Sequence, residues 1–348
     1  MNYQIVQALI DTASADGTAP ALAVDVGNSR RSLWTYAAGH LAYDSTSPKT
    51  TLDTIFDLAS LTKVIATATI TMRYIDSGII TLDDKIGDHL SEWKGDDRAH
   101  VTIRDLLEHS SGLTAHLPFF NDYRGQAEFE PAICQLPLEY KPKSQSIYSD
   151  LGFMLLGFIL SKLNDNDYSL NAQFADIADE RNWGTIGYRP STCWLPHVAP
   201  TEQDSWRGRL LLGEVHDENC YALGSVAGHA GLFGTGTAVG RFARDTLRAL
   251  SGEKTFASTE TVNAFRHKSS VPNSSRALGW DTMLPTSSCG ALMSPQSIGH
   301  TGFTGTSLWL DPIADRYVVL LTNRVCPTRT NDAILKFRPR LHNAIMSV

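Results

Sequence analysis

Residues 56–78, FDLASLTKVIATATITMRYIDSG, are the stretch of this chain that decides its fold. The part from Leu61 to Ser77 is long and apolar, and Gly78 follows where a glycine typically ends a helix. We therefore expect a buried helix over residues 61–77. Ser60 stands at its start, directly after a short β-prone run at residues 54–56.

Ser60 and Lys63 form a Ser-x-x-Lys motif at the beginning of this helix. Residues three apart share one helix face, so the lysine amine can lie beside the serine hydroxyl. Two other matches, at residues 91–94 and 251–254, lie in polar, glycine-containing surroundings. The motif alone is therefore weak, and the position of Ser60 before an apolar helix distinguishes it.

A helix N-terminus offers free backbone N–H groups that can stabilise an oxyanion at an acyl carbon. Apolar walls would also favour a neutral Lys63. Lowering a lysine pKa from about 10.4 to ~7 needs about 4 to 5 kcal/mol, which burial can supply. The alternative is that Ser60 only caps the helix and Lys63 extends to the surface. The local sequence leaves both open.

Strand-type segments lie near both ends of the chain, and helical segments lie between them. This order predicts an α/β (α+β) fold with a sheet domain from residues 1–58 and 225–348 and a mostly helical domain from residues 59–224. Beyond residues 61–77, helices are expected at residues 5–13, 103–109, 148–163 and 332–346, and strands at residues 21–26, 32–36, 297–302, 306–311 and 317–322.

Composition and charge exclude several classes of protein. The 348 residues include 30 Lys and Arg against 37 Asp and Glu, a net charge of −7 that argues against binding nucleic acid or an anionic membrane. The longest apolar run, residues 151–160, is far shorter than the ~20 residues of a membrane span. No basic residue precedes Arg30, unlike a secretory signal. We expect a cytoplasmic protein, or a periplasmic one if a leader has been removed.

The cysteine and histidine patterns indicate no metal site. The five cysteines are odd in number and contain no Cys-x-x-Cys, and the eleven histidines include no His-Glu-x-x-His. We therefore expect neither a disulfide framework nor a metal or other cofactor.

Two further short motifs follow along the chain, Tyr148-Ser149-Asp150 and His300-Thr301-Gly302. With Ser60-x-x-Lys63 they resemble, in order and spacing, the three motifs of the serine β-lactamases and penicillin-binding proteins. The spacing is similar to the class C β-lactamase branch, which includes family VIII carboxylesterases and some D-amino-acid peptidases. The resemblance runs from about residue 20 to about residue 325, with supporting text at residues 56–63, 102–112 and 228–233.

The resemblance implies a β-lactamase/transpeptidase-like fold, in which an antiparallel sheet flanked by helices meets a mostly helical domain and the active site lies between them. It implies that Ser60 is the nucleophile, that Lys63 is its base and that Tyr148 passes protons to and from the leaving group. The oxyanion hole would consist of the backbone N–H groups of Ser60 and Phe303. The substrate would contact Asp150, His300, Thr301 and Gly302. Outside the resemblance, Tyr148 could be a packed core tyrosine and His300 an ordinary strand histidine.

Asp150 and His300 depart from the family's pattern. The family usually has asparagine where Asp150 stands, and a carboxylate near Lys63 would favour the ammonium form and oppose its role as a base. Either Asp150 points elsewhere, or the pair shares a proton in another way. The family often has lysine where His300 stands, and a neutral histidine would attract a substrate carboxylate less. Both departures weaken the β-lactamase hypothesis.

The leading hypothesis is a serine hydrolase with a Ser60 acyl-enzyme, first of all a carboxylesterase. A β-lactamase or D-alanyl-D-alanine-type carboxypeptidase is the alternative enzyme, and a catalytically weak ligand-binding protein is the alternative of another class. The expected partner is a small ester, a β-lactam or a short peptide, and the sequence does not indicate the oligomeric state. The polar residues 216–219 could line the cleft or bind a cation, but we expect a solvated turn there. Arg324 could meet a substrate carboxylate, but we expect a surface arginine.

Overall fold

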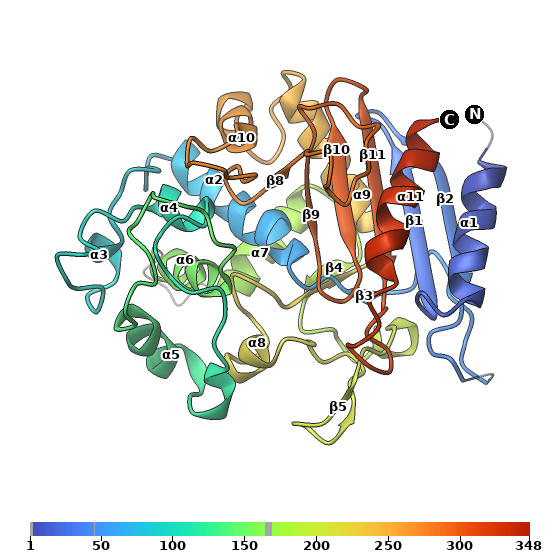
Figure 1. Ribbon diagram of the computed structural model, residues 1–348, viewed down its shortest axis with the longest axis horizontal. Coiled ribbons are helices and arrows are strands. Elements are labelled where there is room, and N and C mark those ends of the chain that lie inside the picture. Colours follow the sequence, from blue (N-terminus) through green and yellow to red (C-terminus); the bar gives the residue numbers. More distant parts are fainter. Residues whose placement is uncertain (1–2, 45, 164–168) are drawn as a thin grey trace.

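The computed structural model describes residues 3–44, 46–163 and 169–348, and its centre is a six-stranded antiparallel sheet (Figure 1). The strand order is β2-β1-β11-β10-β9-β8, so the N-terminal strands pair directly with the C-terminal ones. The strands are β1 (Ala21–Gly27), β2 (Ser32–Gly39), β8 (Asp281–Thr282), β9 (Ile298–Thr301), β10 (Ser307–Asp311) and β11 (Arg316–Thr322).

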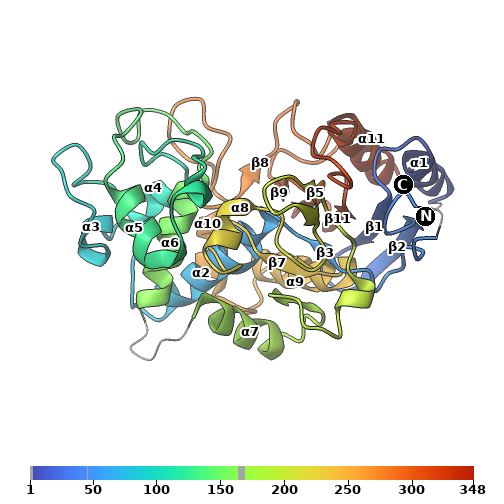
Figure 2. The same ribbon diagram turned by 90° about the horizontal axis from the view of Figure 1, so that it is seen from below.

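Helices cover both faces of this sheet because its central strands are apolar on both sides. In β11, Val318 and Leu320 pack in the cluster with α1 (Gln4–Ala15) and α11 (Ile334–Met346). The alternate residues Val319 and Leu321 pack in the cluster with α9 (Gly236–Leu250). Figure 2 shows α1 and α11 on one side of the strands and α9 on the other.

The helical part of the chain is arranged around α6 (Asp150–Lys162), which is apolar on all sides and buried from Leu151 to Leu160. Ser149 caps it by accepting a hydrogen bond from the N–H of Gly152. The surrounding elements are α2 (Thr69–Asp76), α3 (Ile86–His89), α4 (Ile103–Leu107), η2 (Phe119–Asn121), α5 (Gly125–Cys134), α7 (Leu170–Glu180), η3 (Leu195–His197), α8 (Glu218–Ala222) and α10 (Thr259–Arg266).

The expected helix at residues 61–77 is present, but its first part is wound differently. Residues Lys63–Ala68 form a π-helix, η1, which continues directly into α2. Gly78 follows with a φ of +71°, as a glycine helix end requires. π-Helical turns are found often at functional sites, and Lys63 is the first residue of this one.

A short strand just before Ser60 belongs to a second, three-stranded sheet that the sequence did not predict. Its order is β3 (Phe56–Asp57), β7 (Leu232–Gly234) and β4 (Ile186–Tyr188). A further two-stranded hairpin consists of β5 (Gln203–Asp204) and β6 (Arg209–Leu210). The sheet of β3, β7 and β4 pairs β3, which precedes Ser60, with strands that come much later in the chain.

The predicted fold class is confirmed, with an antiparallel sheet flanked by helices and a large helical part. The division into residues 1–58 with 225–348 and residues 59–224 stays a prediction. In the part of the chain that the structure describes, no helix is both long enough and apolar enough to cross a membrane.

Candidate active site

The turn that carries Ser60 is held by the buried carboxylate of Asp57 at the end of β3. This carboxylate accepts the N–H of Ala59 at 2.8 Å and the N–H of His216 at 2.7 Å, and its burial raises the pKa of Asp57. Ala59 has a φ of +48°, a left-handed conformation that is costly for a non-glycine residue. The structure therefore stores strain directly before Ser60 and orients that residue at the start of the helical run.

Lys63 is completely enclosed and has three hydrogen-bond acceptors. Its Nζ lies 3.0 Å from Ser60 Oγ, 2.7 Å from Asp150 Oδ1 and 3.2 Å from the carbonyl oxygen of His229. Burial alone would lower the pKa of Lys63, but the charge of Asp150 outweighs it and raises that pKa. Three acceptors, one of them a carboxylate, are the surroundings of an ammonium group rather than of a free amine.

Asp150 points at Lys63, which decides one of the alternatives that the sequence left open. Burial would raise the pKa of this carboxyl group, but the Lys63 ammonium lowers it well below its usual range. The other oxygen of Asp150 lies 3.7 Å from Nδ1 of His116. The pair with Lys63 therefore holds its proton on nitrogen in the resting site.

The ring of Tyr148 lies between Lys63 and two histidines. Lys63 Nζ is 4.7 Å from the ring centroid, and the ring centroids of His109 and His300 are 4.7 Å and 5.8 Å away. His109 positions this segment through the N–H of Ser149, which donates to its Nδ1 at 3.0 Å. Desolvation raises the pKa of Tyr148, while the Lys63 charge opposes that rise. The tyrosine is therefore a neutral phenol beside the lysine.

The end of β9 approaches the Ser60 turn so closely that residue 302 has to be glycine. A Cβ on Gly302 would overlap Thr306 Oγ1 and would lie 2.7 Å from the carbonyl oxygen of Leu58. The N–H of Gly302 donates to the carbonyl oxygen of Thr306 at 2.8 Å, and Arg338 donates to the carbonyl oxygen of Gly302 at 3.0 Å. These contacts place Phe303 beside Ser60.

Replacing Gly302 by alanine is expected to lower the free energy of unfolding by about 1–3 kcal/mol, since the added methyl overpacks this contact. Hydrolysis should fall by at least about tenfold, because the segment that follows β9 would move away from Ser60. Thermal unfolding and ester hydrolysis measure the two effects. Gly236→Ala is the matched control, because its Cβ would meet only Ala23 at 4.0 Å. Equal effects of the two variants would contradict the close approach.

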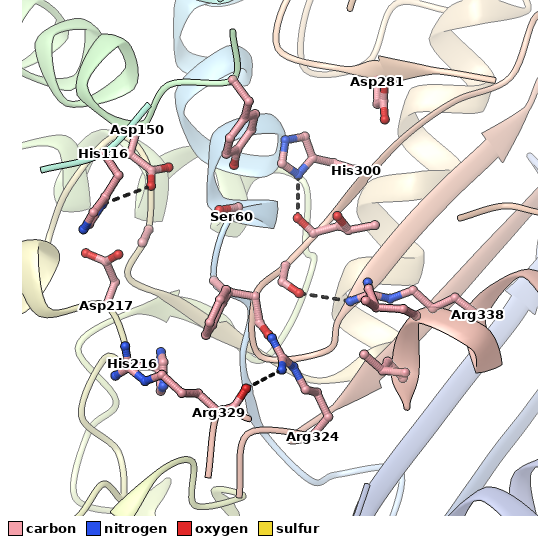
Figure 3. Close-up of a pocket in the computed structure, with 18 of the residues that line it drawn as sticks. Ser60, His116, Asp150, His216, Asp217, Asp281, His300, Arg324, Arg329 and Arg338 are labelled. Carbon is pink, nitrogen blue, oxygen red and sulfur yellow. Dashed lines mark hydrogen bonds and ion pairs between the residues drawn. The ribbon is translucent and has the colours of Figure 1, made fainter. Parts of the chain in front are cut away.

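A cavity of about 770 Å³ opens over Ser60 (Figure 3). Within the described ranges, the backbone N–H groups of Ser60 and Phe303 donate no hydrogen bond to another group of the protein. The cavity wall combines acidic, basic and apolar side chains from the two halves of the chain. It includes Ser60, His116, Tyr148, Asp150, His216, Asp217, Glu218, Arg276, Asp281, His300, Thr301, Gly302, Phe303, Arg324, Arg329, Ile334, Leu335 and Arg338.

The Beta-lactamase family profile matches residues 6–338 of this chain. The chain belongs to the Beta-lactamase family. The resemblance stated from the three motifs is thereby confirmed, and the protein is a serine hydrolase. A protein of Escherichia coli K12 with the provisional name D-alanyl-D-alanine carboxypeptidase is 31% identical over 313 residues, which cover 79% of this chain and 70% of that protein.

Solved structures of other proteins have the same fold at low sequence identity. A class C β-lactamase superposes with a TM-score of 0.77 and 18% identity, covering 99% of this chain and 97% of its own. EstCE1, a hydrolase with promiscuous acyltransferase activity, superposes with a TM-score of 0.75 and 20% identity, covering 97% of each chain.

Residues 216–219 are not the solvated turn that we expected. His216 and Asn219 are buried, and His216 contacts Glu202 at 2.9 Å while its ring stacks on Phe303. Asp217 accepts a hydrogen bond at 2.8 Å from His229 and caps α8. The prediction failed because these partners are remote in sequence, and the polar tetrapeptide alone could not show that it lines the cleft.

Arg324 is likewise not a free surface arginine. It is half-buried at the cavity wall, where its guanidinium lies 4.6 Å from the centroid of the Phe303 ring and its Nε donates to the carbonyl oxygen of Phe303. The structure thus places it as a support of Phe303.

Sequence reasoning missed His116, Arg276 and Arg338 at this site. Arg276 lies 5.0 Å from the centroid of the Tyr148 ring, and Arg338 holds the carbonyl oxygen of Gly302. None of the three belongs to a recognisable motif in this sequence. In the parts of the chain that the structure describes, no three or more His, Cys, Asp or Glu side chains come together as metal ligands.

Proposed function

We propose that this serine hydrolase cleaves small acyl substrates that carry a carboxylate near the scissile bond, as D-alanyl-D-alanine peptides do. The observation that carries the proposal is the guanidinium of Arg276 at the cavity wall, next to Tyr148. The 31% identical Escherichia coli protein, with its provisional carboxypeptidase name, supports the same substrate class.

In the proposed reaction, the Lys63 ammonium first releases a proton. The neutral amine then takes the proton of Ser60 as Ser60 Oγ attacks the acyl carbon. The developing oxyanion lies between the backbone N–H groups of Ser60 and Phe303, which have no hydrogen-bond acceptor among the described residues. Tyr148 transfers a proton to the leaving group, which departs and leaves an acyl-Ser60, and Tyr148 regains a proton from the neighbouring Lys63 ammonium. Water then attacks the acyl carbon, and Ser60 recovers its proton.

Arg276 supplies the positive charge that His300 lacks. His300 is buried, and burial together with the nearby Lys63 charge lowers its pKa well below the ordinary value, so its ring is neutral. The ion pair of Arg276 with Asp281 is long, at 3.9 Å, which leaves the guanidinium able to bind a second carboxylate. A carboxylate bound there would hold the leaving group beside Tyr148.

A carboxylesterase remains the second candidate because the cavity wall also carries apolar side chains. Phe303 and Leu335 are large side chains that are half or more exposed there, at 50% and 63%, and Ile334 lines the same wall. This surface fits an uncharged acyl chain.

D-Alanine release from diacetyl-L-lysyl-D-alanyl-D-alanine tests the proposal against this alternative. We expect turnover of this peptide, and Arg276→Gln should lower its kcat/KM by about 10- to 100-fold, as for the loss of a charged hydrogen bond. The same variant should hydrolyse p-nitrophenyl butyrate at nearly the wild-type rate. Arg104→Gln, which removes an exposed arginine away from the cavity, is the matched control.

Two results would contradict the carboxypeptidase proposal. Ester hydrolysis without any D-alanine release would favour the carboxylesterase. Equal loss of both activities in Arg276→Gln would show that Arg276 does not recognise the substrate carboxylate.

A further inference from the structure

Lys63 has no direct contact with solvent, although it has to lose and regain a proton in each catalytic cycle. Its side chain is 0% exposed, and its three acceptors are Ser60, Asp150 and the carbonyl oxygen of His229. The Tyr148 phenol also hydrogen-bonds Lys63, but in the proposed reaction its proton goes to the leaving group. Among the three acceptors, the Asp150 carboxylate is the group that can take a proton and pass it on. A proton that leaves Lys63 therefore passes to Asp150.

The far oxygen of Asp150 leads to a side chain that reaches solvent. His116 Nδ1 lies 3.7 Å from Asp150 Oδ2, and the His116 side chain is 46% exposed. Figure 3 shows His116 pointing toward Asp150 from the cavity side. At 3.7 Å, a small side-chain movement or one bridging water completes the contact.

We propose that Asp150 and His116 form a proton relay, in which a proton of the Lys63 ammonium passes through Asp150 to His116 and then to solvent, so that neutral Lys63 can take the proton of Ser60. The proposal rests on the acyl-serine reaction proposed above and assigns a role to two residues within it. Asp150 stands where the family usually has asparagine, so the relay would be a feature of this chain rather than of the family pattern.

The proton balance of the relay is simple. The Lys63 ammonium first gives a proton to the Asp150 carboxylate, which passes one from its other oxygen to neutral His116. Neutral Lys63 then takes the proton of Ser60 as the Oγ–acyl bond forms and the leaving group departs. Substrate that displaces water from the cavity favours the first step, because a neutral pair loses less solvation than an ion pair does.

The charges around His116 set the pH at which the relay works. The contact with Asp150 raises the pKa of His116, partial burial opposes this, and Asp217 and Glu218 raise it further. Lys63 also faces Tyr148. The positive charges of Lys63 and Arg276 both lower the pKa values of His109 and His300. Because protonated His116 cannot accept a proton, acylation should rise with pH through a pKa above 6.5, the ordinary value of histidine.

Acylation by p-nitrophenyl acetate isolates this proton transfer. p-Nitrophenolate leaves as an anion, so the only proton that has to move is that of Ser60, and the reaction requires no carboxylate on the substrate. In His116→Ala we expect acylation at pH 7.5 to fall by roughly 10- to 100-fold, with loss of the wild-type acid limb. Added imidazole should restore the rate, since His116 is exposed. His100→Ala, an exposed histidine outside this cavity, should behave as wild type with or without imidazole.

Asp150→Asn separates the relay from a static role of the carboxylate. In the relay, this variant acylates more slowly than wild type, and imidazole does not rescue Asp150→Asn/His116→Ala. If Asp150 only holds Lys63 in its charged form, Asp150→Asn frees the amine and acylates faster than wild type, which would overturn the proposal. A wild-type acid limb in His116→Ala or His116→Gln, or no rescue by imidazole, would overturn it as well.

The same assay distinguishes failure of the relay from failure of the proposed function. Wild type that forms no acyl-Ser60 by intact mass would contradict the acyl-serine reaction and the relay together. Wild type that acylates on Ser60 but releases no D-alanine would contradict only the peptide substrate, and the relay results would still stand.

Discussion

Replacing Ser60 by alanine is expected to lower ester and peptide hydrolysis by about 10⁴- to 10⁶-fold, the usual loss when an enzyme's nucleophile is removed. Ser60 Oγ is the atom that the structure places 3.0 Å from Lys63 Nζ, at the floor of the cavity. The fold should survive, because the change removes one hydroxyl and leaves the Asp57 contacts of the turn intact. Steady-state kinetics, intact mass after a slow ester substrate, and thermal unfolding measure these outcomes.

The chain provides its own matched controls for this prediction. Ser91 and Ser251 also precede a lysine by three positions, but both are exposed and neither lines the cavity. Ser91→Ala and Ser251→Ala should retain wild-type hydrolysis and acyl-adduct formation. Turnover near the wild-type rate in Ser60→Ala, or an adduct on another residue, would contradict the assignment of the nucleophile.

The sequence predicted the parts of the fold that depend on local pattern. The continuous apolar run at residues 151–160 and the short strand-type segments near both chain ends indicate buried elements, and the sheet assembles from these strands. It did not predict the π-helix at Lys63–Ala68, because all six residues are buried and their pattern does not show whether the helix is wound as an α- or a π-helix. It also missed β3, β4 and β7, which have two or three residues each and are defined by pairing between remote segments.

The sequence predicted the residues of the candidate site that belong to a motif and missed those that belong to none. Ser60, Tyr148 and Gly302 line one cavity, and buried Lys63 contacts Ser60, as the ordered motifs suggested, although their catalytic roles stay predictions. The direction of Asp150 could not be decided from sequence, since it depends on a 2.7 Å contact between residues 87 positions apart.

Replacing Lys63 by methionine should abolish activity and also destabilise the protein, by about 1–3 kcal/mol at neutral pH, since it removes the ammonium partner of the Asp150 carboxylate, whose side chain is 19% exposed and keeps its contact with His116. Lys63 lowers the pKa of Asp150 in wild type, so the pair stabilises the fold above pH ~4 and loses this effect as Asp150 protonates at lower pH. In Lys63→Met, burial should raise the pKa of Asp150 instead. The variant should then be relatively more stable in acid, as measured by denaturant unfolding between pH 4 and pH 8.

The double variant Lys63→Met/Asp150→Asn separates stability from catalysis. It replaces the ion pair by two uncharged side chains of similar size, and removing both charges of a buried pair is often close to neutral for stability. We therefore expect the double variant to recover most of the lost free energy of unfolding and none of the activity. If it instead regained hydrolysis, the loss in Lys63→Met would be due to unfolding, and Lys63 would not be the base. If Lys63→Met were as stable as wild type at pH 8, Asp150 could not be the charged partner that the 2.7 Å contact indicates.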